Sequence, residues 1–517
     1  MNGAESLVRT LVAGGVDVCF ANPGTSEMHV VAALDRVEGM RCVLGLFEGV
    51  VTGAADGYFR MKGSPASTLL HLGPGLANGL ANLHNAKKAN SGIVNIVGQH
   101  ATYHIEYNAP LTSDIEGLAR PMSSWVRTSP DAKSVARDGA AAIAAARGAT
   151  GAPPQIATLI LPADTAWNEA DGVAQVPVEP QRQSYSPQAV DHAARILRGG
   201  EQTLLLITGS AVTEKGLSLA AQIAGKTGCK VMGPLASPRM ARGRGRFSIE
   251  RVPYVIELAQ AALKGFRHIV LVEANDPVAF FAYPNKPSLL KPEGCEVHRM
   301  TESGENSVAA LEALASALGA RPADVKPQPP VELVKPTGAL NHMSIAQAIA
   351  LAVPENAIMV DESVTTGRGF FPLTAGAAPH DWIQNLGGSI GYSTPVATGA
   401  AIACPDRKVI CMVGDGSAMY TLQSLWTQAR EGLNVLTIVF ANRIYQILRG
   451  EFDGVGAGEP GQRAQDMLKL DRPTLDWVAL AKGMGVPGCA VTTADEFNKA
   501  LAEAIAEPGP RLIEVQI

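Results

Sequence analysis

Two short stretches near the C-terminal end combine residues that can hold a phosphate and a hard cation. Gly414-Asp415-Gly416-Ser417 follows an apolar run over residues 408–413, and Asn442 follows a second apolar run over 435–440. Backbone N–H groups in a glycine-rich turn can face a phosphate, and a carboxylate beside them can bind the cation. Mg²⁺ takes oxygen ligands from one or two protein side chains and from phosphates. The pattern indicates a site for a diphosphate with its magnesium ion.

The elements that must position these groups follow an α/β pattern. Apolar, strand-like runs alternate with amphipathic helical segments, which is typical of parallel, doubly wound sheets. The 517 residues exceed what one hydrophobic core usually serves, and two proline-rich stretches, 176–187 and 321–336, read as linkers. We expect three doubly wound parallel-sheet units. They are an N-terminal unit over 1–175, a Rossmann-like central unit over 188–320 and a C-terminal unit over 337–517.

Two residues of the N-terminal unit could take part in proton transfer. Glu48 lies just beyond the apolar run 41–47 and enters a helical segment, where the helix dipole alone would favour a carboxylate. His71 follows the apolar run 67–70 and precedes a Gly-Pro-Gly turn, so we expect it to face a cleft. A structural bond to a loop carbonyl is the alternative for this histidine.

The C-terminal motif resembles the thiamin-diphosphate signature of the 2-oxo acid decarboxylase and acetolactate synthase superfamily. In that signature one helix and one strand separate Gly-Asp-Gly from the asparagine, as they do here between Gly416 and Asn442. Ala441 stands where the family often has a first asparagine. The resemblance implies metal ligands at Asp415, Asn442 and Ile444. It also implies cofactor contacts from Gly414, Gly416, Ser417 and Tyr445.

Further stretches resemble the same family at cofactor positions. Glu48 is similar to the buried glutamate that bonds to the pyrimidine ring of the cofactor and takes part in its proton exchange. The loop with Glu362, Ser363 and Thr365 resembles the one that holds the pyrophosphate and the aminopyrimidine. The resemblance also gives cofactor contacts to Gly388, to Ile390 under the thiazolium ring and to Gln99.

On the substrate side the closest resemblance is to benzoylformate decarboxylase. The stretch Asn22-Pro23-Gly24-Thr25 and the Leu70-His71 step are similar to loops that present a hydroxyl and a histidine, which implies roles for Thr25 and His71. The chain also departs from relatives. It lacks the paired histidines of pyruvate decarboxylase, has Leu448 where that enzyme carries a glutamate, and has no histidine between 275 and 284. The substrate therefore stays open.

The resemblance implies an enzyme that uses thiamin diphosphate and Mg²⁺. Its reaction would be non-oxidative decarboxylation and/or carboligation of 2-oxo acids or acyloins, with a small 2-oxo acid or aldehyde as substrate. Because the family builds each site from two subunits, we expect a homodimer or homotetramer. Three alternatives are a C–C lyase, a flavin oxidase resembling pyruvate oxidase with FAD in the central unit, and a binding protein that has lost the chemistry. The G-x-G-x-x-G fingerprint is absent, so FAD is possible but not supported.

Composition narrows the partners and the compartment. A net charge of −5 gives no reason to expect nucleic acid or a membrane as partner. The seven cysteines are scattered without a C-x-x-C pair, and the N-terminus shows no signal-peptide pattern, so we expect a cytoplasmic protein. No His/Cys/Asp cluster has zinc spacing. Seven histidines are interpreted as surface or packing residues: His29, His84, His192, His268, His298, His342 and His380.

Overall fold

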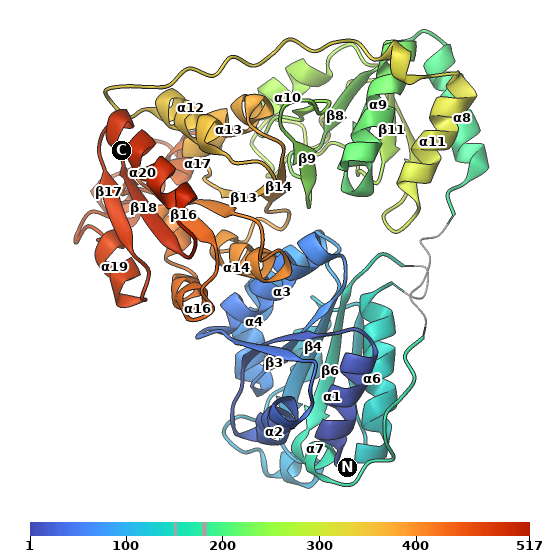
Figure 1. Cartoon of the computed structure of the whole chain (residues 1–517). Coiled ribbons are helices and arrows are strands. Elements are labelled where there is room, and N and C mark those ends of the chain that lie inside the picture. The colour runs from blue at the N-terminus through green and yellow to red at the C-terminus, as the bar shows by residue number, and fades with distance from the viewer. Residues whose placement is uncertain (149–151, 178–183) are drawn as a thin grey trace.

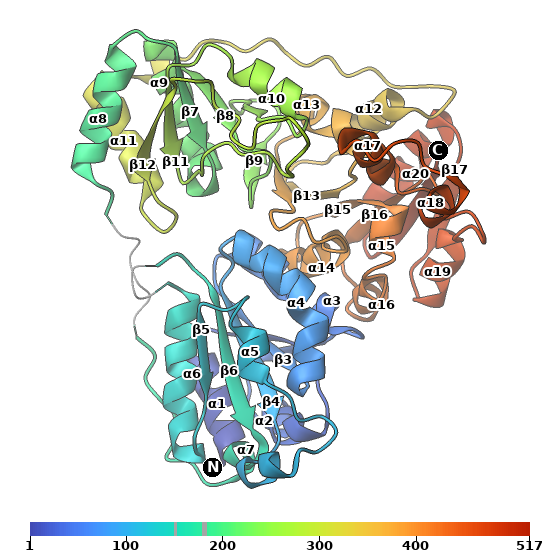
Figure 2. The ribbon, with the colours of Figure 1, turned by 180° about the vertical axis from the view of Figure 1, so that it is seen from behind.

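The chain folds into three α/β units (Figures 1 and 2). A computed structural model describes residues 1–148, 152–177 and 184–517. In Figure 1 the N-terminal unit lies at the bottom, the C-terminal unit at the upper left and the central unit at the upper right. The predicted class, three mostly parallel α/β sheets covered by helices, is confirmed.

The first sheet contains six strands, paired in parallel. They are β1 (Val18–Asn22), β2 (Arg41–Leu44), β3 (Ala66–Leu70), β4 (Ile93–Gln99), β5 (Trp125–Thr128) and β6 (Ile156–Pro162). Their spatial order is β2-β1-β3-β4-β6-β5. The chain runs outward in opposite directions from β1 and from β3, and ligands of such sheets bind beyond the carboxyl ends at this reversal. The surrounding helices are α1 (Gly3–Ala13), η1 (Thr25–Glu27), α2 (Met28–Arg36), α3 (Glu48–Lys62), α4 (Leu72–Lys88), η2 (Thr102–Tyr107), α5 (Ile115–Ala119), α6 (Ala132–Ala146) and α7 (Ala163–Trp167).

The second sheet belongs to the central unit and is parallel. Its strands are β7 (Thr203–Ile207), β8 (Lys230–Gly233), β10 (Glu250–Arg251), β11 (His268–Val272) and β12 (Glu296–Thr301). They are arranged in the order β10-β8-β7-β11-β12. The helices of this unit are α8 (Pro187–Arg198), η3 (Gly209–Val212), α9 (Glu214–Thr227), α10 (Ile256–Leu263), α11 (Ser307–Leu318) and η4 (Pro322–Asp324).

The third sheet belongs mainly to the C-terminal unit. Its strands are β9 (Met240–Arg242), β13 (Ala357–Glu362), β14 (His380–Gln384), β15 (Val409–Gly414), β16 (Val435–Ala441), β17 (Gly488–Val491) and β18 (Arg511–Gln516). Their order is β17-β18-β16-β15-β13-β14-β9, so the direction of winding reverses between β13 and β15. The helices are α12 (His342–Ala352), η5 (Thr366–Gly369), α13 (Phe370–Leu373), η6 (Thr374–Gly376), α14 (Ser393–Ala403), α15 (Asp415–Ala418), α16 (Ser424–Arg430), α17 (Gln446–Gly454), α18 (Gln462–Met467), α19 (Trp477–Gly483) and α20 (Ala494–Ala506).

One strand departs from the predicted division into units. β9 lies between β8 and β10 in the sequence but pairs antiparallel with β14 of the third sheet. It covers an edge that would otherwise expose unpaired N–H and C=O groups. The boundaries 1–175, 188–320 and 337–517 stay a prediction. Of the first predicted linker, residues 178–183 lie outside the described part of the chain. Of the second, residues 325–336 contain neither helix nor strand.

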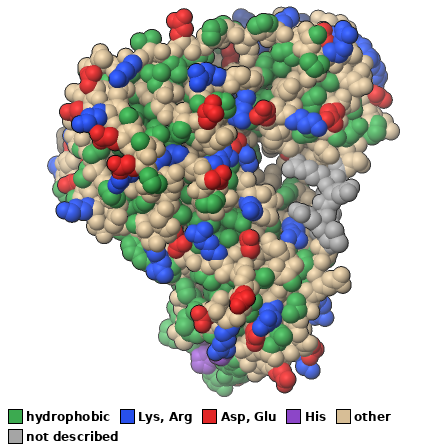
Figure 3. All heavy atoms as spheres, viewed as in Figure 1, with side chains coloured by type: hydrophobic (Ala, Val, Ile, Leu, Met, Phe, Trp, Pro, Cys, Tyr) green, Lys and Arg blue, Asp and Glu red, His purple; other side chains and the backbone are tan. Residues whose placement is uncertain are grey.

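The surface agrees with the modest net charge. Acidic and basic side chains are interspersed over the face drawn in Figure 3, without a large field of one sign. No helix among the described residues is both long and apolar enough to cross a membrane.

Helices α3 and α14 pack so closely that their backbones touch. A β-carbon on Gly57 would lie 2.1 Å from the carbonyl oxygen of Val396, and one on Gly399 would lie 1.8 Å from that of Ala54. Only glycine fits at both positions. This contact joins the first and third units, and both helices begin at the candidate site, since Glu48 opens α3 and Ser393 opens α14.

We therefore expect Gly57→Ala and Gly399→Ala each to destabilise the protein by about 1–3 kcal/mol, because the added methyl group must push the two helices apart. Thermal unfolding followed by circular dichroism measures the effect. Gly483→Ala is the matched control, because it also lies in a helix and a β-carbon there meets nothing within 4 Å. Equal stability of all three variants would contradict the tight contact.

Candidate active site

Thr25, Glu27 and His71 meet beyond the carboxyl ends of β1 and β3, at the reversal point of the first sheet. Thr25 is exposed at the start of η1, whereas Glu27 at its end is buried. His71 follows β3, and its Nδ1 lies 2.8 Å from Oε2 of Glu27. The ring packs against Gly24, where a β-carbon would lie 2.3 Å from Nδ1. His71 is thus bonded to a carboxylate in place of the loop carbonyl considered as the alternative, and its position facing a cleft stays a prediction.

Glu27 is the residue of this cluster that the sequence analysis missed. Its Oε2 accepts the backbone N–H of Gly24 at 2.7 Å, and its Oε1 has no hydrogen-bond partner among the described residues. A β-carbon on Gly98 would lie 1.6 Å from Oε1, so Gly98 leaves room for the carboxylate. Burial raises the pKa of Glu27, against the opposing effects of the Gly24 N–H and of His71. The signal in the sequence was a carboxylate two residues after Thr25.

Glu48 lies beside this cluster. It opens α3, and its Oε2 accepts the side-chain amide of Asn78 at 3.0 Å. A β-carbon on Gly75 would lie 3.4 Å from both Glu48 Oε1 and His71 Cβ, so these two residues face the same small space. The sequence predicted a buried glutamate, but in the single chain Glu48 is only half-buried. Part of its side chain is therefore open to solvent in the single chain.

Gln99 ends β4 near the same group. Its side chain is buried, and Oε1 accepts the backbone N–H of His100 at 2.8 Å. Burial lowers the pKa of His100, and the positive charges of His104 and His71 lower it further. All four residues predicted in the N-terminal unit, Thr25, Glu48, His71 and Gln99, therefore lie at or just after the carboxyl ends of strands of the first sheet.

A second cluster forms beyond β15 and β16 in the third sheet. Asp415 follows β15, and its oxygens accept the backbone N–H groups of Gly416 at 2.9 Å and Arg443 at 2.7 Å. Arg443 has a φ of 58°, a left-handed conformation that is rare for a non-glycine residue and turns its N–H toward Asp415. Burial raises the pKa of Asp415. The β15 turn and the β16 turn are thereby held together.

The other predicted ligands belong to the turn after β16, which Asp415 contacts through the Arg443 N–H. Asn442 Oδ1 accepts the N–H of Ile444 at 3.1 Å, and the carbonyl of Ile444 accepts the N–H of Gln446 at 2.9 Å. Tyr445 packs on the turn, since a β-carbon on Gly416 would lie 2.4 Å from its ring. Carboxylate, amide and carbonyl oxygens form the kind of donor set that Mg²⁺ prefers, so these residues fit a diphosphate-bound magnesium ion.

Glu362 anchors the loop that contains Gly388 and Ile390. The buried carboxylate at the end of β13 accepts the N–H groups of Gly391 at 2.7 Å and Ser393 at 2.9 Å, and the hydroxyl of Ser393 at 2.7 Å. Burial raises its pKa. Glu362 thus holds the loop in place. Ser363 donates to Asp361 at 2.5 Å and so turns back toward β13, while Thr365 lies half-buried just before η5.

The same loop is also held from the first unit, by α4. Asn85 donates to the carbonyl of Ser389 at 2.9 Å and accepts its N–H at 3.1 Å. Asn82 donates to Gly391 and His84 to Gly387, at 3.3 and 3.0 Å. His84 was interpreted as a surface or packing residue, and its contact with the loop is a finding of the structure.

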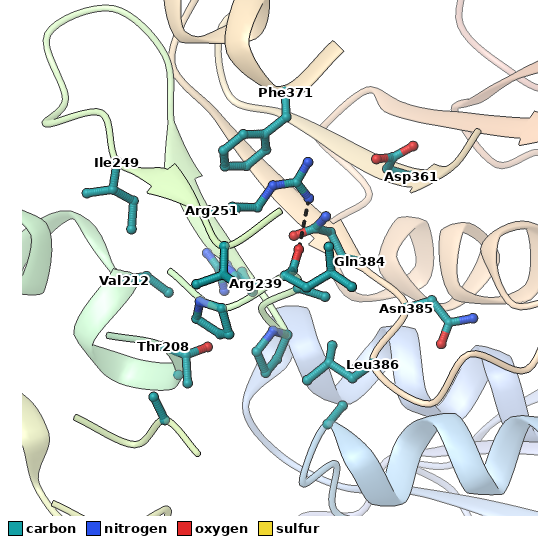
Figure 4. A pocket seen from close by; sticks show the side chains of 18 of the residues that line it. Thr208, Val212, Arg239, Ile249, Arg251, Asp361, Phe371, Gln384, Asn385 and Leu386 are labelled. Carbon is teal, nitrogen blue, oxygen red and sulfur yellow. Dashed lines mark hydrogen bonds between the residues drawn. The ribbon is translucent and has the colours of Figure 1, made fainter. Parts of the chain in front are cut away.

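A cavity of about 2630 Å³ opens beside the second cluster and extends into the central unit. Five of the predicted site residues line this cavity: Glu362, Gly388, Ile390, Ser417 and Tyr445. Figure 4 shows part of its wall, where Arg251 lies 3.8 Å from the centre of the Phe371 ring. Thr25, Glu48, His71 and Gln99 are not among the residues that line it. The predicted metal ligands Asp415, Asn442 and Ile444 are not among its lining residues either.

The central unit does not present the turn that a dinucleotide requires. In dinucleotide-binding sheets the pyrophosphate takes N–H groups at the turn after the first strand. Here the Glu273 carboxylate accepts both the N–H, at 3.1 Å, and the hydroxyl of Ser210 in the turn after β7. A β-carbon on Gly209 would lie 2.1 Å from Glu273 Oε2, so an acidic group fills this place. These residues do not fit the diphosphate of FAD at this turn.

Comparison with known proteins identifies the family. Models for the N-terminal and the C-terminal thiamine pyrophosphate binding domains of thiamine pyrophosphate enzymes match residues 1–118 and 370–515. The chain belongs to the thiamin-diphosphate enzymes. It is 51% identical over 519 residues to a Mycobacterium tuberculosis protein named "Putative acetolactate synthase large subunit IlvX", covering 100% of this chain and 99% of the relative.

Two other relatives are decarboxylases. A benzoylformate decarboxylase of Pseudomonas aeruginosa is 31% identical over 537 residues, which cover 97% of this chain and 96% of that protein. The structure of a thiamine diphosphate-dependent 4-hydroxybenzoylformate decarboxylase of Rhodococcus jostii superposes with a TM-score of 0.86 at 26% identity, covering 100% and 99% of the two chains. The predicted resemblance to decarboxylases and acetolactate synthases is confirmed. None of these relatives is named as an oxidase.

The buried Glu27 gives the site a pH-dependent stability. An acid whose pKa is raised by folding stabilises the fold below its ordinary value of 4.5, and this contribution is lost as pH rises through the folded pKa. Glu27→Gln has no such loss. We expect the stability of the variant relative to the parent to increase from pH 4.5 upward, as measured by chemical unfolding at a series of pH values.

The exposed Glu293 provides the control, since Glu293→Gln should leave the pH dependence unchanged. A constant difference between parent and Glu27→Gln across this range would show that Glu27 is not a buried, protonation-sensitive group.

Proposed function

We propose that this thiamin-diphosphate enzyme requires Mg²⁺ and acts on 2-oxo acids or acyloins by non-oxidative decarboxylation and/or carboligation. One observation carries the proposal. Each of the two reversal points, in the first and in the third sheet, has the residue types that its half of such a site needs, and the two halves are far apart in the sequence. When bound, thiamin diphosphate supplies an electron-accepting ring next to the substrate carbonyl, which makes loss of CO₂ possible.

Asp415, Asn442 and Ile444 would hold the metal ion in this proposal. Gly414, Gly416, Ser417 and Tyr445 would border the diphosphate, and Ile390 would support the ring system. Glu362 would act as a positioning residue through the loop that it anchors. Ser363, Thr365 and Gly388 belong to the loops around the same space, so we keep them as cofactor-side residues.

The N-terminal residues would transfer protons to and from the cofactor and the substrate. Glu48 would bond to the pyrimidine ring of the cofactor, with Gln99 near it, and exchange a proton there. Because Nδ1 of His71 lies against the Glu27 carboxylate, its Nε2 is free to give a proton to, or take one from, a substrate atom. The Thr25 hydroxyl is exposed beside it and would orient the substrate carboxylate or carbonyl.

We propose that two subunits complete each site, as a homodimer or homotetramer. In one chain the N-terminal residues do not line the cavity that Ile390, Ser417 and Tyr445 border, and Glu48 is only partly buried. A two-fold axis would bring the cluster of one subunit to the motif of the other and would produce two equal sites. The unpaired state of all seven cysteines fits work in the reducing cytoplasm.

The wall of the cavity favours an apolar acyl group. Phe280, Phe281 and Leu448 line it and are each about half exposed. Phe280 lies against the Ile390 loop, since a β-carbon on Gly388 would lie 2.8 Å from its ring. Assaying the protein with thiamin diphosphate, Mg²⁺ and a panel of 2-oxo acids, with CO₂ and acyloins as products, tests this. Turnover confined to small, polar acids would contradict the proposed apolar pocket.

Two variants separate the roles of the two halves. Glu48→Gln should keep its affinity for thiamin diphosphate, because the diphosphate and the metal supply the anchoring. Its turnover and its exchange of the C2 proton of the bound cofactor should both be at least about a hundredfold slower. Asp415→Asn should bind the cofactor more weakly, because it removes a charged oxygen ligand from the metal.

Fluorescence titration with cofactor and ¹H NMR exchange measure the two properties. Equal exchange in parent and Glu48→Gln would remove Glu48 from the proton chemistry. Unchanged, Mg²⁺-dependent cofactor affinity in Asp415→Asn would remove Asp415 from the metal site.

A further inference from the structure

Three histidines and two glutamates gather on the central unit, at the end of its sheet opposite the cavity. His268 begins β11, Glu296 begins β12, and His298 is two residues further along β12. His192 comes from α8, and Glu201 from the turn between α8 and β7. The cavity is lined instead by residues that follow the carboxyl ends of these strands, such as Glu273 after β11. The cluster is therefore separate from the candidate active site.

The pairing of the two strands places three ligand atoms around one point. In the parallel register His268 is directly opposite Glu296, and residues two apart on a strand share a face, so His298 points the same way as Glu296. Nδ1 of His268 and Nε2 of His298 are 3.1 Å apart. Oε2 of Glu296 lies 3.5 Å from His298 Nε2 and 3.8 Å from His268 Nδ1.

These separations of 3.1, 3.5 and 3.8 Å lie within about 0.2 Å of those of ligands that share one metal ion. Bonds of about 2.0–2.2 Å in tetrahedral geometry place the ligand atoms about 3.3–3.6 Å from one another. Two imidazole nitrogens and one carboxylate oxygen are a ligand set used for Zn²⁺ in proteins. The ligands lie on paired strands, whose positions are fixed by the sheet and not by a mobile loop.

The outer nitrogen of His268 has a partner of the expected kind, a carboxylate, whereas that of His298 faces another histidine. Nε2 of His268 lies 2.8 Å from Oε2 of Glu201. Nδ1 of His298 lies 3.2 Å from Nε2 of His192, whose other nitrogen is 3.5 Å from Arg195. A metal-binding histidine usually donates its second N–H to a carboxylate or similar acceptor, which fixes the tautomer that presents the other nitrogen to the metal. The Glu201 contact prepares His268 in this way.

We propose that His268, Glu296 and His298 form a site for a divalent transition-metal ion, with Zn²⁺ as the ion that fits best and a water molecule in the fourth position. The sequence shows no zinc spacing because the ligands come from two strands that are distant in the chain. Under this proposal His268 and His298 are ligands and His192 is a neighbour of one of them, in place of the surface or packing roles predicted for them. The competing arrangement is a chain of N–H···N hydrogen bonds, in which one proton lies between His268 and His298 where the metal would lie.

Metal titration of the full chain tests this site. The protein is first treated with chelator and then saturated with thiamin diphosphate and Mg²⁺, so that the diphosphate site is filled. Zn²⁺ binding is then measured by isothermal titration calorimetry, and Co²⁺ is used as a probe through its visible absorbance in tetrahedral sites. We expect one equivalent to bind per chain with a micromolar or tighter Kd.

Variants assign the binding to these residues. His268→Ala and His298→Ala should each weaken Zn²⁺ at least about a hundredfold and remove the Co²⁺ absorbance, and Glu201→Gln should weaken binding about tenfold. His29→Ala, an exposed histidine in the N-terminal unit, is the control and should bind as the parent does. Should an alanine variant unfold, as judged by circular dichroism, the glutamine variant at the same position replaces it.

Three results would overturn the proposal. They are the absence of a stoichiometric binding event, an unchanged affinity in both His268→Ala and His298→Ala, and an equal loss of affinity in His29→Ala. In each case the histidines form only a hydrogen-bonded chain. The outcome is independent of the reaction at the thiamin-diphosphate site, because cofactor-dependent turnover is not the measured quantity.

Discussion

The backbone contact between α3 and α14 is the constraint on which the rest of the structure depends. Glycines at 57 and 399 let the helices approach until carbonyl oxygens occupy the space of a side chain. Since Glu48 is the first residue of α3 and the Ile390 loop leads directly into α14, this contact sets where both begin. Two further interactions join the first and third units. Asn85 of α4 donates a hydrogen bond to the Ile390 loop, and Arg60, which is paired with the buried Asp56, donates to the carbonyl of Gln384 at 2.6 Å.

Three buried carboxylates are stabilised in the same way, by hydrogen bonds from backbone N–H groups. Glu27, Glu362 and Asp415 are each withdrawn from water, which raises the pKa of each, and each accepts backbone N–H groups of a neighbouring turn. These hydrogen bonds offset part of the free-energy cost of burying the carboxylates, and they fix the geometry of the turns that donate them. Glu27 orients His71, Glu362 fixes the Ile390 loop, and Asp415 joins the turns after β15 and β16. Buried acids that accept backbone N–H groups thus fix the loops around the candidate site.

The sequence predicted what depends on local order. Apolar runs that end in a chemically distinctive turn identified β15 with Asp415, β16 with Asn442 and β3 with His71, because a parallel strand is continuous in the sequence. It could not predict what depends on contacts between distant segments. Glu27 became notable only once β1 and β3 were neighbours, and the roles of Asn82 and Asn85 required α4 to face a loop about 300 residues away. The edge strand β9 and the His268–His298 cluster were hidden for the same reason.

Completion of each site by the N-terminal cluster of one subunit and the C-terminal motif of another is the central claim of the proposed function. Glu48→Gln and Asp415→Asn, co-expressed with different affinity tags and purified through both, give mixed dimers. If the claim holds, one of the two sites in each mixed dimer carries both intact residues. With thiamin diphosphate and Mg²⁺ in excess, such dimers should recover about half of the parent activity, although each parent variant alone is nearly inactive. If each site were instead formed within a single chain, every site would carry one lesion, and the mixed dimers would be as inactive as the separate variants.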